Sequence, residues 1–138
     1  MSQYESFTEN QVFLGMQFYG TDDIYRVLKK SCEEQNLKSV RVDELVNSNT
    51  IIDDIKQLIE ESEFIILDLT YSNPNVYYEL GYADGVGNEG IDILLIAKDD
   101  TKLHFDTQHR RVLFYKDAYD LQEKLKEALP KFINGGRK

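Results

Sequence analysis

The segment Phe64-Ile65-Ile66-Leu67-Asp68-Leu69-Thr70 contains the most hydrophobic run of the chain and decides the fold. Its first four residues show no polar alternation, which is typical of a strand that is covered on both faces of a parallel sheet. Asp68 ends the apolar run. Shortly after it, Asn73-Pro74 predicts the start of a helix, with asparagine at the N-cap and proline at the first helical position. This order of strand, loop and helix is the repeating unit of a parallel α/β sheet.

The same alternation of strands and helices extends in both directions from this unit. Strands are predicted at 11–16, 38–42, 64–67, 91–97 and 111–115, and helices are predicted behind 21–23, behind 49–50, at 73–74 and behind 117. This order predicts an α/β domain with a doubly wound, five-stranded parallel sheet in the flavodoxin-like order 2-1-3-4-5. A chain of 138 residues forms one domain, 1–138, in which 1–10 and 134–138 are expected to be frayed tails.

Composition and charge narrow the classes of partner. The chain is 41% hydrophobic and 30% charged, so a packed core with a solvated surface is expected. Its formal net charge of -9 and the lack of a Lys/Arg-rich stripe argue against binding to a nucleic acid polymer, whereas a few backbone amides and one arginine can still hold a small nucleotide. Cys32 is the single cysteine, and no apolar run approaches the roughly 20 residues that span a bilayer. We therefore expect a cytoplasmic protein with no membrane partner, no disulfide and no zinc site.

Ligands of doubly wound sheets bind beyond the carboxyl ends of the strands, where the strand order reverses. In this chain that rule indicates the loops at 15–20, 41–44 and 68–75 and the stretch after Ala97. Gly85-Val86-Gly87-Asn88-Glu89-Gly90 matches the glycine pattern of dinucleotide sites. It follows a helix and precedes a strand, which is the reverse of the order that such sites need, so it predicts a helix end and a turn.

The helix that starts at Asn73-Pro74 carries an unusual set of side chains. A helical wheel separates a core stripe of Val76, Leu80 and Ala83 from an adjacent face of Asn75, Glu79 and Tyr82, with Tyr78 beside that face. Asn75 and Glu79 are one turn apart and can contact the same ligand. The helix N-terminus favours the ionised form of Glu79, while burial opposes it. From the local pattern alone, Glu79 is either a functional carboxyl or a surface residue in a salt bridge.

Several motifs coincide with the predicted ligand edge. They are Val12-Phe13-Leu14-Gly15-Met16-Gln17-Phe18, Arg41-Val42-Asp43, Asp68-Leu69-Thr70, and the run from Asn73-Pro74-Asn75 through Glu79-Leu80-Gly81 to Tyr82-Ala83. Together they resemble the superfamily that contains nucleoside 2-deoxyribosyltransferases, nucleotide N-glycosidases and the TIR-like nucleotide-binding proteins of bacteria. His104-Phe105-Asp106 is similar to a late Phe-Asp element of the TIR-like branch. The resemblance covers about residues 11–116.

The resemblance implies a role for each matching residue. Glu79 takes the place of the catalytic glutamate at the anomeric carbon, and Asp68 takes that of an acid that positions or protonates the leaving base. The substrate-binding positions implied are Gly15, Met16, Gln17 and Phe18 around the nucleotide, Arg41 and Asp43 at a phosphate and a sugar hydroxyl, and Asn73, Asn75, Tyr78, Tyr82, Phe105 and Asp106 bordering the site.

The chemistry suits these residue types. Cleavage of an N-glycosidic bond passes through an oxocarbenium-like state, which a nearby carboxylate stabilises. Classical deoxyribosyltransferases have a small Ser-Gly type turn where this chain has Asn73-Pro74-Asn75. This departure favours a nucleotide, NAD or a nucleoside monophosphate, over a free nucleoside. The resemblance thus implies a hydrolase of the N-glycosidase or NAD nucleosidase type, or a deoxyribosyltransferase. It would need no metal or cofactor, with NAD a possible substrate, and would form a homo-oligomer. The alternatives are a non-catalytic module that binds a nucleotide signal and a TIR-like interaction module, either of them in bacterial antiviral signalling.

Overall fold

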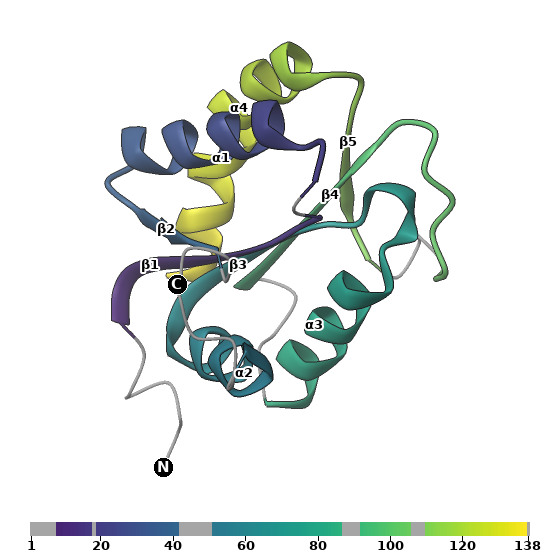
Figure 1. Cartoon of the computed structure of the whole chain (residues 1–138). Helices are drawn as coiled ribbons and strands as arrows, with labels where there is room; N and C mark the ends of the chain where they lie inside the picture. The colour runs from purple at the N-terminus through teal and green to yellow at the C-terminus, as the bar shows by residue number, and fades with distance from the viewer. Residues whose placement is uncertain (1–7, 18, 42–50, 87–91, 106–109, 138) are drawn as a thin grey trace.

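Strands and helices alternate from β1 to β4, and β5 and α4 follow (Figure 1). The computed structural model describes residues 8–17, 19–41, 51–86, 92–105 and 110–137. The elements are β1 Thr8–Gly15, α1 Asp22–Glu34, β2 Lys38–Val40, α2 Ile51–Glu61, β3 Ser62–Asp68, a short 3-10 turn η3 Thr70–Ser72, α3 Pro74–Gly85, β4 Ile93–Lys98, β5 Val112–Tyr115 and α4 Ala118–Gly136.

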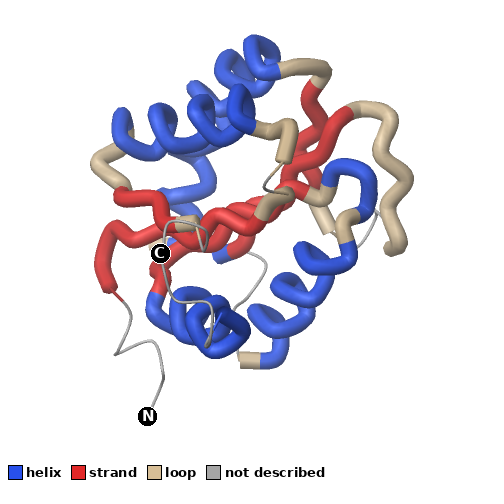
Figure 2. The backbone as a smooth tube through the Cα atoms, viewed as in Figure 1, coloured by secondary structure: helices blue, strands red, loops and turns tan. Residues whose placement is uncertain are grey.

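The strands form one parallel sheet in the order β2-β1-β3-β4-β5 (Figure 2). The predicted α/β class and the flavodoxin-like order 2-1-3-4-5 are confirmed. The central strand β3 pairs with β1 on one side, where Gly15 lies opposite Leu67, and with β4 on the other, where Asp68 lies opposite Ile96. Residues 64–68 are all buried, as expected for a strand that is covered on both faces.

Each face of the sheet has its own hydrophobic core. Helices α1 and α4 cover one face, and α2 and α3 cover the other (Figure 1). Because side chains alternate along a strand, Phe64 and Ile66 pack toward α1 and α4, whereas Ile65 and Leu67 pack toward α2 and α3. By the same alternation, Asp68 lies on the face of α1 and α4.

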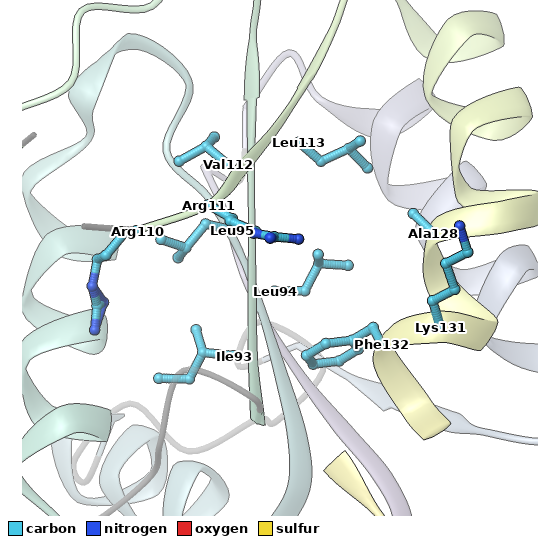
Figure 3. A pocket seen from close by; sticks show the side chains of 10 residues that line it. All are labelled: Ile93, Leu94, Leu95, Arg110, Arg111, Val112, Leu113, Ala128, Lys131 and Phe132. Atoms are coloured by element: carbon cyan, nitrogen blue, oxygen red, sulfur yellow. The ribbon is translucent and has the colours of Figure 1, made fainter. Parts of the chain in front are cut away.

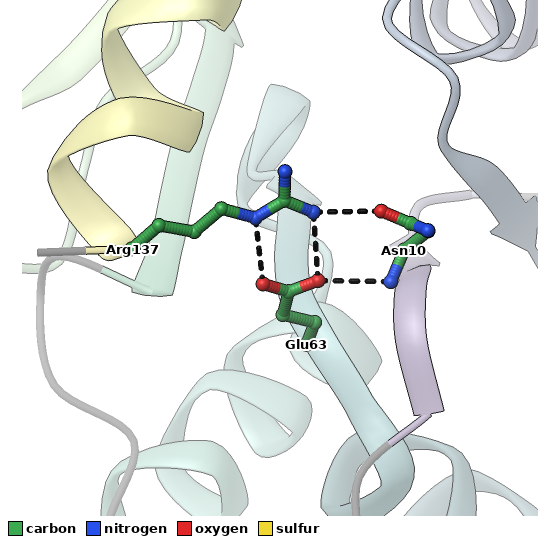
Figure 4. Close-up of polar contacts among 3 residues, drawn as sticks. All are labelled: Asn10, Glu63 and Arg137. Atoms are coloured by element: carbon green, nitrogen blue, oxygen red, sulfur yellow. Dashed lines mark hydrogen bonds and ion pairs between the residues drawn. The ribbon is translucent and has the colours of Figure 1, made fainter.

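The start of β1 and the end of α4 meet at the amino-terminal edge of the sheet (Figure 4). Arg137 donates from Nε to Glu63 Oε2 over 2.9 Å and from Nη2 to Asn10 Oδ1 over 2.7 Å. Strand β1 begins at Thr8 and α4 continues to Gly136, so parts of both predicted tails belong to regular secondary structure. None of the helices within the described ranges is long and apolar enough to cross a bilayer.

Candidate functional site

Glu79 lies in the second turn of α3. Asn73 caps the helix by accepting a hydrogen bond from the Asn75 amide over 2.9 Å. The core stripe of Val76, Leu80 and Ala83 is buried, as the helical wheel predicted. Glu79 is also buried, with 6% of its surface exposed, so it is not a surface residue in a salt bridge. Burial raises the pKa of its carboxyl from 4.5 to about 8 because an apolar surrounding disfavours the charged form.

The carboxyl group of Glu79 packs against the backbone of Gly15, the last residue of β1. A Cβ added to Gly15 would lie 2.6 Å from Glu79 Oε1 and 2.5 Å from Leu67 Cδ2. Neither distance is compatible with van der Waals packing, so only glycine fits here without a shift of its neighbours. The Glu79 carboxyl group therefore lies against the carboxyl end of β1, at the edge of the sheet where α/β domains bind ligands.

Asp68 occupies a different environment at the same edge. Its Oδ1 accepts hydrogen bonds from the Thr70 amide over 3.0 Å and from Thr70 Oγ1 over 2.5 Å, and its Oδ2 accepts one from the Tyr115 hydroxyl over 2.7 Å. Thr70 Oγ1 also accepts from the Lys98 amide over 3.0 Å. Burial raises the pKa of Asp68, while the hydrogen bonds from Thr70 and Tyr115 oppose that rise.

The structure does not bring Asp68 and Glu79 together as a hydrogen-bonded pair. Asp68 faces α1 and α4, and the partners of its carboxylate are Thr70 and Tyr115. Glu79 belongs to α3, on the opposite face of the sheet, where Leu67 also packs. The Asp68 carboxyl group links Thr70 of η3 to Tyr115 of β5, and its predicted role at the leaving base stays a prediction.

A small cavity of about 50 Å³ lies beside Asp68 at the carboxyl edge. The polar side chains among its lining are Gln17, Thr21, Asp68, Thr70, Lys98 and Tyr115. Tyr71, which also lines the cavity, and the adjacent Ser72 adopt positive φ angles of 59° and 53°, which are strained for residues other than glycine. Ser72 Oγ donates to the Lys102 carbonyl over 2.5 Å, and this bond helps to hold the strained turn.

The other positions implied by the resemblance are dispersed. Met16 is buried, whereas Gln17 is exposed and donates to the Tyr19 carbonyl over 2.9 Å. The Arg41 guanidinium is buried and lies 3.9 Å from the centre of the Tyr25 ring. Phe18, Asp43 and Asp106 lie outside the described residues.

The other residues on the predicted ligand-facing side of α3 have different surroundings from Glu79. Asn75 and Tyr78 are exposed, while Tyr82 is half-buried and donates a hydrogen bond from its hydroxyl to Glu60 of α2. That bond raises the pKa of Tyr82 to about 12. Tyr82 thus joins two helices. A helical wheel of α3 could not predict this contact, because Glu60 belongs to a different helix.

Phe105 and its neighbour pack against the start of α3. The rings of Phe105 and Tyr77 meet edge to face with centres 6.2 Å apart, and the ring of His104 lies 5.3 Å from that of Tyr77. The His104 amide also donates to the Tyr77 hydroxyl over 3.1 Å. The segment after β4 therefore borders the start of α3.

Sequence reasoning gave no role to Tyr115, Lys98 and Thr70 around Asp68. An Asp-x-Thr pattern at a strand end was the available signal for Thr70, because such side chains bond nearby backbone amides. Tyr115 is 47 positions from Asp68 along the chain, and no local pattern indicates such a contact.

The chain matches no family model, and no curated protein matches it. The resemblance to the deoxyribosyltransferase and TIR-like superfamily therefore stays a prediction. Within the described ranges, no group of His, Cys, Asp and Glu side chains could hold a metal ion.

Proposed function

We propose that the chain is a nucleotide N-glycosidase in which Glu79 is the catalytic carboxyl and NAD is the favoured substrate. One observation carries this proposal: a buried carboxyl with a pKa of about 8 packs on the Gly15 backbone at the carboxyl edge of the sheet. Strongly perturbed acids at ligand-binding edges are typical of catalytic groups. The motif around Glu79 and its resemblance to glycosidase relatives support the same role.

The reaction needs a carboxylate close to the anomeric carbon. When the bond from C1′ to the base nitrogen breaks, the electron pair leaves with the base, and positive charge develops on C1′ and the ring oxygen. A carboxylate about 3 Å away stabilises this charge or forms a transient bond to C1′. Water then supplies a hydroxyl group to C1′ and releases a proton, or a second base takes the place of water in an exchange reaction.

The raised pKa of Glu79 favours a cationic leaving group. Without ligand, a carboxyl with a pKa of about 8 is mostly protonated at pH 7. A positive ring in contact with it favours ionisation, so the nicotinamide ring of NAD would favour the carboxylate form of Glu79, which then acts on C1′ of the ribose. Nicotinamide also leaves as a neutral molecule without taking up a proton, which suits a site where Asp68 faces away.

The test is release of free base from defined substrates. The purified protein is incubated with NAD, AMP, CMP, dCMP and deoxynucleosides, and released base is measured by chromatography. We expect nicotinamide from NAD, and a loss of about a thousandfold or more in Glu79→Gln, as for removal of a catalytic carboxyl. Because free enzyme must lose the Glu79 proton, kcat/KM should rise about tenfold between pH 7 and pH 9.

Asp84→Asn is the matched control, since Asp84 lies on the same helix but is exposed and paired with Arg110 at 2.6 Å. It should release base at the wild-type rate. Calorimetric binding of NAD with no release by the wild type would instead show a nucleotide sensor. Full turnover in Glu79→Gln would show that another group does the chemistry.

A further inference from the structure

A second, larger hollow lies at the β5 edge of the sheet (Figure 3). It is a half-open groove of about 730 Å³, within the range of small-molecule sites, about 300–1,000 Å³. Its apolar lining consists of Ile93, Leu94, Leu95, Val112, Leu113, Ala128 and Phe132. We call it the β5 groove.

The groove exists because β5 is shorter than β4. The ladder between the two strands begins with Leu95 opposite Val112. Ile93 and Leu94, the first two residues of β4, therefore lack a strand neighbour on the β5 side among the described residues. The side chains of Leu94, Leu113 and Phe132 are only partly buried, so apolar surface remains accessible where a longer strand would have covered it.

The charged side chains of the β5 groove are all cationic. Arg110, Arg111 and Lys131 line it, and no acidic residue does, although the chain has 25 acidic and 16 basic residues. Arg110 points toward α3, where its Nη2 is 2.6 Å from Asp84 Oδ1, and Lys131 pairs with Glu127 at 2.9 Å. Arg111 extends across the groove toward α4 (Figure 3), and no described residue forms an ion pair with it.

We propose that the β5 groove binds an amphipathic carboxylate, a molecule with an aliphatic tail and one carboxyl group. The apolar floor takes the tail, and the Arg111 guanidinium receives the carboxylate in a charge-assisted, bidentate hydrogen bond. Because Arg110 and Lys131 are already paired with carboxylates, the Arg111 charge and not the overall negative field of the protein selects the ligand. This site is independent of Glu79 and of the proposed glycosidase activity.

The test uses decanoate below its micellar concentration, measured by titration calorimetry on the full chain. Decanoate should bind with one-to-one stoichiometry, and decylammonium should bind at least about tenfold more weakly. Arg111→Gln should weaken decanoate binding about tenfold or more, because it removes the charge that meets the carboxylate. Arg110→Gln is the matched control: the neighbouring arginine is already paired with Asp84, so this variant should bind decanoate as the wild type does.

A second variant tests the apolar floor without touching Arg111. Ala128→Phe places a ring in the groove from the surface of α4, and it should weaken decanoate binding while leaving release of base by Glu79 unchanged. Equal binding of decanoate and decylammonium, or unchanged binding in Arg111→Gln, would overturn the proposal. So would a wild-type dimer that dissociates in Ala128→Phe, because a second copy of the chain would then be the occupant.

Discussion

Two glutamates at opposite edges of the sheet differ in the surroundings and in the pKa of their carboxyl groups. Glu63, at the amino-terminal edge, accepts hydrogen bonds from Asn10 N over 2.8 Å and from Arg137 Nε over 2.9 Å (Figure 4). The hydrogen bond from Arg137 lowers its pKa. Glu79, at the carboxyl-terminal edge, is buried against Gly15 without an ion-pair partner among the described residues, and burial raises its pKa to about 8.

The contrast shows where the molecule tolerates an unfavourable group. At Glu63 the carboxylate has a cationic partner, and its hydrogen bonds link α4 to β1 and β3. A buried carboxyl without a cation lowers stability, and groups of this kind tend to persist at functional sites. The edge that carries Glu79 is also the edge where parallel α/β sheets bind ligands.

The largest expected effect is a gain of stability in Glu79→Gln at high pH. The folded pKa of about 8 is higher than the ordinary value of 4.5. The folded state therefore binds the proton more tightly, and the cost of ionising Glu79 is absent below about pH 4.5, grows with pH and is complete above pH 8. Each pKa unit corresponds to about 1.4 kcal/mol and the pKa rises from 4.5 to about 8, so the neutral amide should raise the free energy of unfolding by about 5 kcal/mol at pH 9.

Urea unfolding of the wild type and Glu79→Gln at pH 4.5, 7 and 9 measures this effect. The two proteins should be nearly equal at pH 4.5, because the wild-type carboxyl is then neutral in the folded state. A difference that stays constant across the pH range would mean that the amide changes packing and that the glutamate does not titrate near pH 8.

Gly15→Ala should have the next largest effect. The added Cβ would come within 2.6 Å of Glu79 Oε1 and within 2.5 Å of Leu67 Cδ2, and both side chains are enclosed. Overpacking of this kind costs about 1–3 kcal/mol, and a displaced Glu79 should also slow base release. Thermal unfolding and the release assay measure the two consequences.

Gly81→Ala is the control for Gly15→Ala, because nothing lies within 4 Å of an added Cβ at this position of α3. Alanine also favours a helix over glycine by up to about 1 kcal/mol, so this variant should be as stable as the wild type or more stable. Equal stability of the two alanine variants would show that Gly15 does not fix the position of Glu79.

The sheet and the helix of Glu79 were predictable from local patterns. The unalternated run at Phe64-Ile65-Ile66-Leu67 indicated a buried parallel strand, and Asn73-Pro74 indicated the helix start. Both patterns depend only on residues that are adjacent in the sequence. The burial of Glu79 was only one of two interpretations, because it depends on Gly15, which lies 64 positions earlier in the sequence. Its contact requires the pairing of β1 with β3.

The relation between Asp68 and Glu79 was beyond local patterns for a related reason. Which face a strand residue occupies follows from alternation, but which helices cover that face follows from the topology of the whole sheet. Asp68 lies on the face of α1 and α4, where it binds Tyr115 of β5. The expectation of two cooperating carboxylates came from the resemblance, and the hydrogen bonds of Asp68 do not support it.

The smallest expected effect comes from Glu63→Gln, at the other end of the comparison. The side chain of Glu63 is 11% exposed and forms a two-point contact with Arg137, a geometry for which about 1 kcal/mol is typical. The pKa of Glu63 lies below its ordinary value of 4.5, so this stabilisation is present above pH 4.5 and is lost as the pH falls through the folded pKa. Urea unfolding at pH 7 should detect the loss in Glu63→Gln, whereas base release should stay at the wild-type rate.

Glu127→Gln removes an exposed ion pair with Lys131 on α4 and should leave stability unchanged. If the two variants lost equal stability, the contact between Glu63 and Arg137 would contribute no more than an exposed ion pair. The contrast between Glu63 and Glu79 would then depend on Glu79 alone.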